Sequence, residues 1–338
     1  MVSLEEVARR ANVSTATVSR ALSGRGRISD ATRERVRDAA DAMGYVVSAS
    51  ASSLASGRTQ NIGVLVPLLD KWFFAMVLSG IANHLAPRGY DITLYNVTDD
   101  PEQRRRLFSS SLRRRRVDGL VALSVDLDAD DVAHLQDLGL PVVGLGAPGP
   151  GLAALRVDDV AVARTATEHL LELGHREIAH IGLDKEAGDE HDIPTLRTRG
   201  FEATLAEAGL EPAGFEPADF TIDEGHRAAR KLLQGERRPT AIFAASDELA
   251  FGALFAAREL GLDVPRDLSI VGVDGHEMSE FFGLTTVAQF PHDQGERAGD
   301  AILALVETGS LPDDASLPDD ASLPFELIVR TTTGPAPR

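Results

Sequence analysis

The segment SLEEVARRANVSTATVSRAL, residues 3–22, decides how the first part of this chain folds. Ser3 can cap a helix, and Glu6 follows three residues later, which is the spacing of a capping box. The apolar residues that recur at helical period on one face are Leu4, Val7, Ala8 and Ala11. Asn12 follows, where a tight turn needs a left-handed backbone that Asn tolerates. We therefore expect a short helix that ends in a turn.

A second helix, TATVSRAL, is predicted after Ser14, whose hydroxyl can cap it. Its apolar side consists of Val18, Ala21 and Leu22. The residues left to face outward are Thr15, Ala16, Ser19 and Arg20. A third helix, DATRERVRDAADAM, begins after Ser29 and ends at Gly44. Short helices around a tight turn, with small polar side chains and one arginine on the second, describe a helix-turn-helix.

The charge of the chain is unevenly distributed. Residues 1–60 contain nine arginines and six acids, a net charge of +3, within a chain of net charge −18. A small basic part on a large acidic one is expected when only the small part approaches a polyanion. Chance variation over a window of this length is the alternative explanation.

Composition excludes several classes of protein. A length of 338 residues predicts two or three domains, and 43% hydrophobic residues are too many for a disordered chain. No stretch approaches the roughly 20 apolar residues of a membrane helix, and the acidic start does not resemble a signal peptide. The absence of cysteine excludes disulfides, cysteine-bound zinc and cysteine nucleophiles. We expect a cytoplasmic protein.

Residues 2–67 resemble the amino-terminal signature of the LacI/GalR family of bacterial transcriptional repressors. The matching elements, in family order and spacing, are V-S-x-x-T-V-S-R at 13–20, S-x-x-T-R-x-R-V at 29–36, Met-Gly-Tyr at 43–45, Leu-Ala-Ser-Gly-Arg-Thr at 54–59 and Ile-Gly-Val at 62–64. The resemblance implies a helix-turn-helix domain at 1–47, a hinge at 48–59 and an effector-binding and dimerisation domain at 60–338.

The same resemblance implies roles in DNA binding. Thr15, Ala16 and Arg20 would enter the major groove, with Arg20 donating two hydrogen bonds to a guanine and Ala16 touching a thymine methyl group. The residues expected to contact phosphates are Ser14, Thr17, Ser19, Arg25 and Arg27. The alternative for Arg20 is a surface ion pair with Glu5 or Glu6.

Residues 48–57, SASASSLASG, are small and polar around one large apolar residue. In family members this segment becomes a helix on the operator and wedges a leucine into the minor groove. The resemblance assigns the wedge to Leu54 and the helix cap to Ser48. The sequence departs from the family pattern, because Val47-Ser48 replaces the usual Pro-Asn and Ser52 the usual arginine. A plain flexible linker is the alternative.

From residue 61 strand and helix patterns alternate in two series. The first predicts strands at 61–67, 91–97, 117–124 and 141–146 and helices around 74–87 and 102–115. The second predicts strands at 176–183, 218–220, 240–246 and 268–275 and helices around 194–209, 225–234 and 247–260. Two such series indicate two doubly wound parallel α/β lobes.

This arrangement resembles the periplasmic sugar-binding proteins, whose architecture the family uses for its effector domain. The resemblance implies that lobe 1 spans about 60–157 and 288–312 and lobe 2 about 158–287 and 323–338. The chain would cross back to lobe 1 near 284–289 and return with 325–330.

Ligands of such sheets bind beyond the carboxyl ends of the strands. Asp70, Trp72 and Phe73 follow the first strand, and Trp72 suits stacking on a sugar ring, with a core or dimer-interface aromatic as the alternative. The resemblance adds three residues to the cleft: Arg197 of an R-x-x-G-[FY] motif, Ser246 and Asp274. Gln289 is a further candidate contact. A guanidinium, carboxylate and hydroxyl around one aromatic ring suit a polyol.

Other patterns are rejected. Residues 144–149 fit a dinucleotide-binding pattern, but Pro148 and Pro150 block the helix that must follow. The arginine-rich segment 103–116 is interpreted as a solvated helix, the acids at 184–192 lack metal-ligand spacing, and the repeated SLPDDA within 310–325 receives no function. His175 and His180 are expected to be structural. We find no catalytic, metal or cofactor motif.

The sequence therefore predicts a regulator, not an enzyme, that represses genes as a homodimer on a near-palindromic operator. A mono- or disaccharide would act as its effector, and no membrane partner is expected. The alternatives are control by a non-sugar ligand or by a protein co-regulator, and more remotely a stand-alone solute-binding protein.

Overall fold

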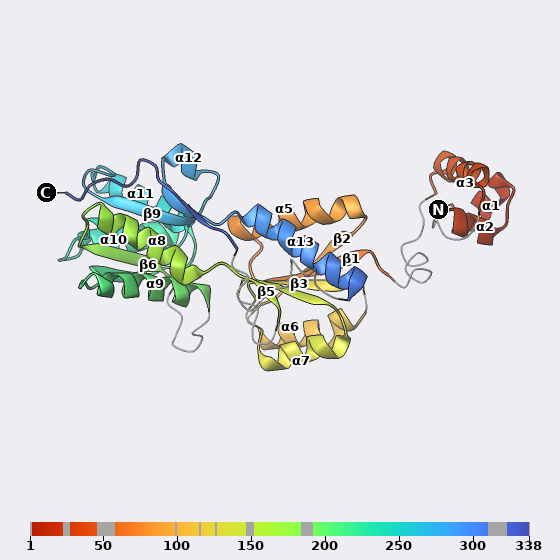
Figure 1. Ribbon diagram of the computed structural model, residues 1–338, viewed down its shortest axis with the longest axis horizontal. Helices are drawn as coiled ribbons and strands as arrows, with labels where there is room; N and C mark the ends of the chain where they lie inside the picture. Colours follow the sequence, from red (N-terminus) through yellow and green to blue (C-terminus); the bar gives the residue numbers. More distant parts are fainter. Residues whose placement is uncertain are drawn as a thin grey trace. The chain divides into compact units, whose positions relative to one another are not determined.

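The computed structural model describes residues 2–22, 28–45, 58–98, 100–114, 116–125, 127–146, 152–183, 192–309 and 323–337. The chain divides into a small unit, Met1–Asn61 with Arg116–Asp118, and a large unit, Ile62–Arg115 with Gly119–Arg338. Figure 1 shows the elements of both. Within the described ranges, no helix combines the length and hydropathy needed to cross a bilayer.

Three helices form the head, by which we mean residues 2–45. They are α1 (Leu4–Ala11), α2 (Thr15–Leu22) and α3 (Asp30–Met43). The predicted capping box is confirmed, since Ser3 Oγ accepts from Glu6 N at 3.2 Å and Glu6 Oε2 accepts from Ser3 N at 2.7 Å. Asn12 takes the predicted left-handed conformation with φ 52°, and Gly44 ends α3 in the same way with φ 62°.

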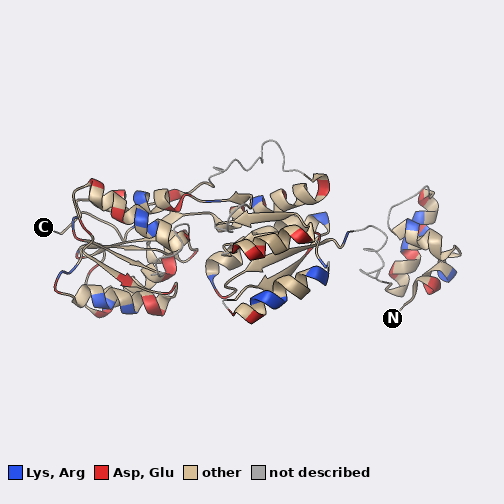
Figure 2. Ribbon diagram, turned by 90° about the horizontal axis from the view of Figure 1, so that it is seen from below, with Lys and Arg blue, Asp and Glu red and all other residues tan. Residues whose placement is uncertain are grey.

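The head has its own small core. The buried residues, from all three helices, are Val7, Ala8, Ala11, Val18, Ala21, Val36, Ala39 and Ala40. Arg35 Nε donates to Ala11 O at 3.1 Å, which ties α3 to the end of α1. Figure 2 shows basic and acidic residues interspersed over the outside of these helices. The tight core fixes which side of α2 is exposed.

The first lobe contains a five-stranded sheet of order β2-β1-β3-β4-β5. Its strands are β1 (Asn61–Val66), β2 (Asp91–Asn96), β3 (Gly119–Leu123), β4 (Val142–Leu145) and β5 (Ala154–Leu155), of which β1, β3, β4 and β5 pair in parallel. Helices α5 (Trp72–Leu85) and α13 (Pro291–Thr308) cover one face, and α6 (Pro101–Arg106) and α7 (Ala129–Leu138) cover the other (Figure 1).

The second lobe contains a six-stranded sheet of order β11-β10-β9-β8-β6-β7. Its strands are β6 (Ile178–Gly182), β7 (Gly214–Pro217), β8 (Ala241–Ala244), β9 (Ser269–Asp274), β10 (Thr285–Ala288) and β11 (Glu326–Ile328). Only β11 is antiparallel to its neighbour among these recorded pairings. The helices are α8 (Asp159–Glu172), α9 (Ile193–Glu207), α10 (Ile222–Gln234), α11 (Asp247–Glu259) and α12 (Ser279–Phe282).

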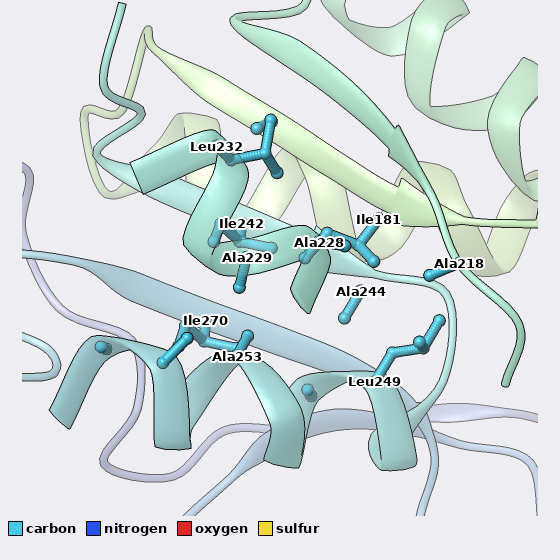
Figure 3. Close-up of a cluster of buried hydrophobic side chains, with 14 of the residues drawn as sticks. Ile181, Ala218, Ala228, Ala229, Leu232, Ile242, Ala244, Leu249, Ala253 and Ile270 are labelled. Atoms are coloured by element: carbon cyan, nitrogen blue, oxygen red, sulfur yellow. The ribbon is translucent and has the colours of Figure 1, made fainter. Parts of the chain in front are cut away.

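Each sheet is covered by closely packed helices. Figure 3 shows small side chains of α10 and α11, such as Ala229 and Ala253, packed against branched side chains of β6, β8 and β9, such as Ile242 of β8. A Cβ on Gly225 would overlap the carbonyl of Leu249, so glycine lets α10 approach α11. This dense packing makes each lobe a rigid platform for the loops at its strand ends.

The chain passes between the lobes more than once. Val157 packs against the cores of both lobes, and α13 leaves the second sheet after β10 to pack on the first. Leu323 belongs to the first core, whereas Phe325 packs on the second. Such multiple crossings permit the lobes to rotate about short connections while each core stays intact.

Three sequence predictions need correction. The strand predicted at 218–220 lies instead at Gly214–Pro217, and Ala218 follows it as a buried loop residue. The helix predicted around 102–115 is α6 followed by a π-helical turn at Leu107–Ser111 and a 3₁₀ turn at Leu112–Arg114. Helices α7, α8 and α13 were not anticipated. Arg104 of α6 bonds to Asp131 of α7, with Nε to Oδ2 at 2.7 Å, which fixes this irregular stretch.

Candidate functional sites

The outer side of α2 is the candidate DNA-reading surface. Thr15, Ala16, Ser19 and Arg20 are exposed, whereas Val18 is fully buried. The structure therefore exposes on one helix the three residues assigned to the major groove, Thr15, Ala16 and Arg20, together with Ser19, which was assigned to a phosphate contact. An exposed helix face of this size fits a major groove about 12 Å wide.

Ser14 and Thr17 start this helix and bond to each other. Ser14 Oγ accepts from Thr17 N at 3.1 Å and lies 2.9 Å from Thr17 Oγ1. Their hydroxyls therefore stabilise the turn in the structure, in addition to the phosphate contacts expected of them. Arg25, Arg27, Ser48 and Leu54 lie outside the described residues.

A carboxylate anchors the chain at residues 59–60, where the predicted hinge would end. Asp118 Oδ1 accepts from Thr59 N at 2.6 Å and from Thr59 Oγ1 at 2.9 Å. Its Oδ2 accepts from Gln60 N at 2.8 Å, and Gln60 has φ 54°. Sequence reasoning missed Asp118, whose only signal was a carboxylate just before the buried strand β3. It holds residues 59–60 beside the start of that strand.

Two contacts join the lobes at the carboxyl ends of their strands. Lys71 Nζ donates to Phe220 O at 2.5 Å. The rings of Trp72 and His276 stack with centroids 4.3 Å apart and planes at 29°. The Trp72 Nε1 is buried and has no hydrogen-bond partner in the described structure. The predicted aromatic thus lies between the lobes, on a histidine that sequence reasoning missed.

Arg197 of α9 is almost fully buried between main-chain and carboxylate acceptors. Its Nε donates to Asp159 Oδ1 at 2.9 Å, and its Nη1 donates to Ala245 O at 2.5 Å. Asp274 Oδ1 lies 4.0 Å from the same Nη1. Asp159 was missed because 38 residues separate it from Arg197. The guanidinium is held rigidly with one carboxylate on each side.

Asp274 is the last residue of β9, and Gln289 directly follows the adjacent strand β10. Gln289 Nε2 donates to Asp274 Oδ1 at 3.2 Å, and Gln294 Nε2 donates to Gln289 O at 2.7 Å. Asp274 has φ 120°, a left-handed conformation that L residues rarely adopt. Asp274 therefore links the three predicted residues, by a hydrogen bond to Gln289 and an ion pair with Arg197.

The other predicted ligand residues have different surroundings. Ser246 is buried and caps α11, with its Oγ accepting from Leu249 N at 3.2 Å. Asp70 is exposed near the end of the loop before α5. Phe73 packs on the core of the first lobe and meets Phe74 edge-on at 5.9 Å. Of these three, Asp70 alone is exposed enough to meet a ligand without rearrangement.

Asp247 supports the loop that carries His276. Its Oδ2 accepts from His276 N at 2.7 Å and from Ser279 Oγ at 2.8 Å. Met278 N donates to His276 Nδ1 at 3.0 Å, which requires that nitrogen to be unprotonated. A buried acid therefore positions the imidazole on which Trp72 stacks.

We call Lys71, Trp72, Asp159, Arg197, Asp274, His276 and Gln289 the interlobe site. Burial raises the pKa of Asp247 to about 6 and that of Asp274 well above its usual range, the latter against the attraction of Arg197. Burial also raises the pKa of Asp159, again opposed by Arg197. Burying these carboxylates in their charged form costs free energy, and a ligand that donates hydrogen bonds to them would reduce that cost.

Two further histidines that the structure describes occupy structural positions. His180 is buried against Phe243 with ring centroids 4.8 Å apart, and His175 bonds to Thr240 Oγ1 at 2.9 Å, so both occupy structural positions. Within the described ranges, the residues that could hold a metal are His292, Asp293 and Glu296. They lie at the start of α13, where the helix dipole opposes a cation.

Comparison with known proteins identifies both parts of the chain. Residues 3–48 match the family described as bacterial regulatory proteins, lacI family, and residues 167–333 match the periplasmic binding protein-like domain. Catabolite control protein A of Priestia megaterium is 32% identical over 301 residues, which cover 87% of this chain and 89% of that protein. The chain belongs to the lacI family.

Other family members give the same result. The HTH-type transcriptional repressor PurR of Aliivibrio salmonicida is 32% identical over 91% of this chain and 93% of its own. The Lac repressor dimer bound to operator and the anti-inducer ONPF has a TM-score of 0.84 at 27% identity, covering 98% of this chain and 99% of that chain. The transcriptional regulator CelR in complex with cellobiose has a TM-score of 0.70 at 29% identity, covering 98% of this chain and all of that chain.

The protein is accordingly a DNA-binding transcriptional repressor with a ligand-binding domain, and it is not an enzyme. The predicted family and the fold class, a helical head followed by parallel α/β lobes, are both confirmed.

Proposed function

We propose that this lacI-family repressor binds a near-palindromic operator as a homodimer in the cytoplasm and is controlled by a sugar-like effector in the interlobe site. The observation that carries the proposal is the buried cluster of Arg197, Asp274 and Gln289 at the strand ends of the second lobe. Trp72 of the first lobe stacks on His276, two residues after Asp274. Sugar hydroxyls both donate and accept, and each needs a directional partner. The related transcriptional regulator CelR forms a complex with cellobiose, a disaccharide.

In this proposal the exposed side of α2 reads the operator. Arg20 donates two hydrogen bonds to a guanine, and Thr15 and Ala16 contact neighbouring bases. The residues that would bind phosphates are Ser14, Thr17, Ser19, Arg25 and Arg27. These contacts place each head on one half-site.

The hinge would order on DNA. Ser48 would cap a helix and Leu54 would enter the minor groove, while Asp118 fixes where the hinge ends. Domain boundaries at 1–47, 48–59 and 60–338 follow from this assignment.

An exposed apolar surface of the second lobe supports a homodimer. Phe281 is 81% exposed, with Met278 and Phe255 also exposed nearby. Phe282, the neighbour of Phe281, packs against Phe255 with ring centroids 5.9 Å apart, so these residues share one surface. Contiguous exposed apolar residues of this kind mark protein interfaces, and a related Lac repressor forms a dimer on its operator.

The switch would act through the contacts that join the lobes. The Lys71–Phe220 hydrogen bond and the Trp72–His276 stack hold one arrangement of the lobes. A ligand shifts the balance between arrangements only by its difference in affinity for them. Since each half-operator is reached through a hinge attached to the first lobe, a change in lobe arrangement alters how the two hinges can meet.

Two experiments test the proposal together. Selection of bound sites from random DNA, using the full chain, should yield a near-palindrome with half-sites about one helical turn apart. A thermal-shift screen of mono- and disaccharides should reveal a stabilising sugar. Intact operator binding with no stabilising sugar would favour a non-sugar ligand or a protein co-regulator.

A further inference from the structure

The interlobe site and its immediate surroundings carry more acids than bases. The acids are Asp70, Asp159, Asp247, Glu248 and Asp274, and the bases are Lys71, Arg197 and His276. Burial lowers the pKa of His276, which favours its uncharged form. Asp274 interacts electrostatically with Asp159, Asp247 and Glu248, and Glu248 interacts with Asp70 and Lys71. The formal charge of this group is therefore negative although a guanidinium lies at its centre.

Lys71 and Arg197 already have strong partners. Arg197 donates to Asp159 at 2.9 Å and to Ala245 O, with Asp274 at 4.0 Å. Lys71 donates to Phe220 O at 2.5 Å across the lobes. Sites for phosphate or carboxylate groups typically offer arginine or lysine side chains that can turn their donors toward the anion. Here Arg197 Nε and Nη1 instead donate to oxygens of the protein itself, Asp159 Oδ1 and Ala245 O.

We infer that the effector carries no negative charge: it is a neutral or amine-bearing polyol that donates hydrogen bonds to the carboxylates of the interlobe site. The inference rests on the proposed function and narrows its ligand class, because it excludes sugar phosphates and sugar acids. Burying an anion beside several carboxylates is unfavourable. One like charge about 6 Å away, at an effective dielectric constant of about 20, weakens binding about a hundredfold. An ammonium group at the same distance strengthens binding by a similar factor.

Trp72 provides a readout specific to this site. It is the only tryptophan in the chain, and it stacks on His276 between the lobes. Its fluorescence can be followed while the full-length protein is titrated with matched forms of glucose, galactose and ribose: neutral, amine-bearing, phosphorylated and carboxylated. The dissociation constant obtained from these titrations should be at least about a hundredfold lower for a neutral or amine-bearing form than for its anionic counterpart. A phosphorylated or carboxylated form that binds as tightly as the neutral one overturns the inference.

A substitution separates this inference from the proposed function. Asp159→Asn removes the carboxylate that neutralises Arg197. The dissociation constant for inorganic phosphate, read from Trp72 fluorescence, should therefore be at least about tenfold lower in the variant than in the wild type. Asp158→Asn is the matched control, since Asp158 is exposed, caps α8 through Ala161 N at 2.9 Å, and Asn caps as well as Asp.

The outcomes are distinct. If wild type and Asp159→Asn respond equally to phosphate, the charge inference is wrong even if a neutral sugar binds. If no sugar changes Trp72 but Asp159→Asn gains phosphate binding and Asp158→Asn does not, the charge selectivity stands and the sugar effector is wrong. Thermal melting of each variant confirms that it is folded, and Asp274→Asn provides a second removal of a carboxylate near Arg197.

Discussion

Replacing Arg197 by Met tests how the interlobe site is held together. Both Arg197 and Asp159 are about 5% exposed, so the substitution leaves a buried carboxylate without its guanidinium. Breaking such a pair costs about 3–5 kcal/mol of unfolding free energy. Asp159→Asn should cost less, about 1–2 kcal/mol, because Arg197 keeps Ala245 O and the nearby Asp274 as partners.

The double variant is the decisive member of this cycle. In the Asp159→Asn background, Arg197→Met no longer leaves Asp159 as an unpaired buried charge, although Asp274 still loses its ion pair. The double variant should therefore be more stable than the sum of the single changes predicts by about 1–3 kcal/mol. The cost of Arg197→Met should also shrink as the pH falls. Burial already raises the pKa of Asp159 against the pull of Arg197, and without Arg197 this carboxyl protonates more readily.

Urea unfolding of the full chain, followed by Trp72 fluorescence and by circular dichroism, measures these free energies at pH 5.5 and 8. Strictly additive effects, within about 0.5 kcal/mol, would refute the reasoning, because they would mean that the two groups do not neutralise each other. A cost of Arg197→Met that is the same at both pH values would contradict the assignment of an ionised, buried Asp159.

Four further predictions follow from individual residues. Arg20→Ala should cost about 1–3 kcal/mol of operator affinity and relax the preference at one base pair; a uniform loss over all sequences would make Arg20 a phosphate contact. Phe281→Asp should yield monomers in sedimentation experiments with an unchanged melting temperature, and persistent dimers would place the interface elsewhere. Asp118→Asn should weaken operator binding about tenfold while leaving effector affinity unchanged, since it loosens the end of the hinge; equal losses of both affinities would argue against this role. Burial raises the pKa of Asp247 to about 6, so the contribution of this carboxyl to wild-type stability falls as the pH rises from about 4 to 6. Asp247→Asn should therefore gain stability relative to the wild type across that window, by up to about 1.4 kcal/mol per pH unit. A difference between their thermal melts that does not depend on pH would contradict this prediction.

Local signals made the head predictable from the sequence. The capping box of Ser3 and Glu6, the left-handed Asn12 and the period of the apolar residues all act within a few residues of one another. They therefore specify each helix boundary before any tertiary contact forms. The buried strands β1 and β9 were equally clear, because continuous branched apolar runs are typical of a sheet covered on both faces.

The errors arose where tertiary contacts decide the structure. Strand β7 lies at the edge of its sheet and alternates between partly buried and exposed residues, so the more apolar segment beside it, which includes the buried Ala218, gave the stronger signal. The arginine-rich stretch after Pro101 reads as one continuous helix, but its last turns are π-helical and 3₁₀.

The site was predicted only in part for the same reason. Arg197 and Asp274 were found because they stand in family motifs, whereas Asp159, Asp118 and His276 act through partners distant in sequence. Thr59 and Asp118 are 59 residues apart, for example. No local pattern marks such pairs. Ser246 was also placed in the site by its motif, and the structure adds that its hydroxyl caps α11, which local spacing alone did not indicate.

The most direct test of ligand control is one linked pair of titrations. Fluorescence anisotropy would give the affinity of the full chain for its selected operator with and without the sugar that stabilises it. Trp72 fluorescence would give the affinity for that sugar with and without the operator. We predict that each ligand changes the affinity for the other by the same factor, of about 5- to 150-fold. An operator affinity that no bound sugar alters would contradict the account.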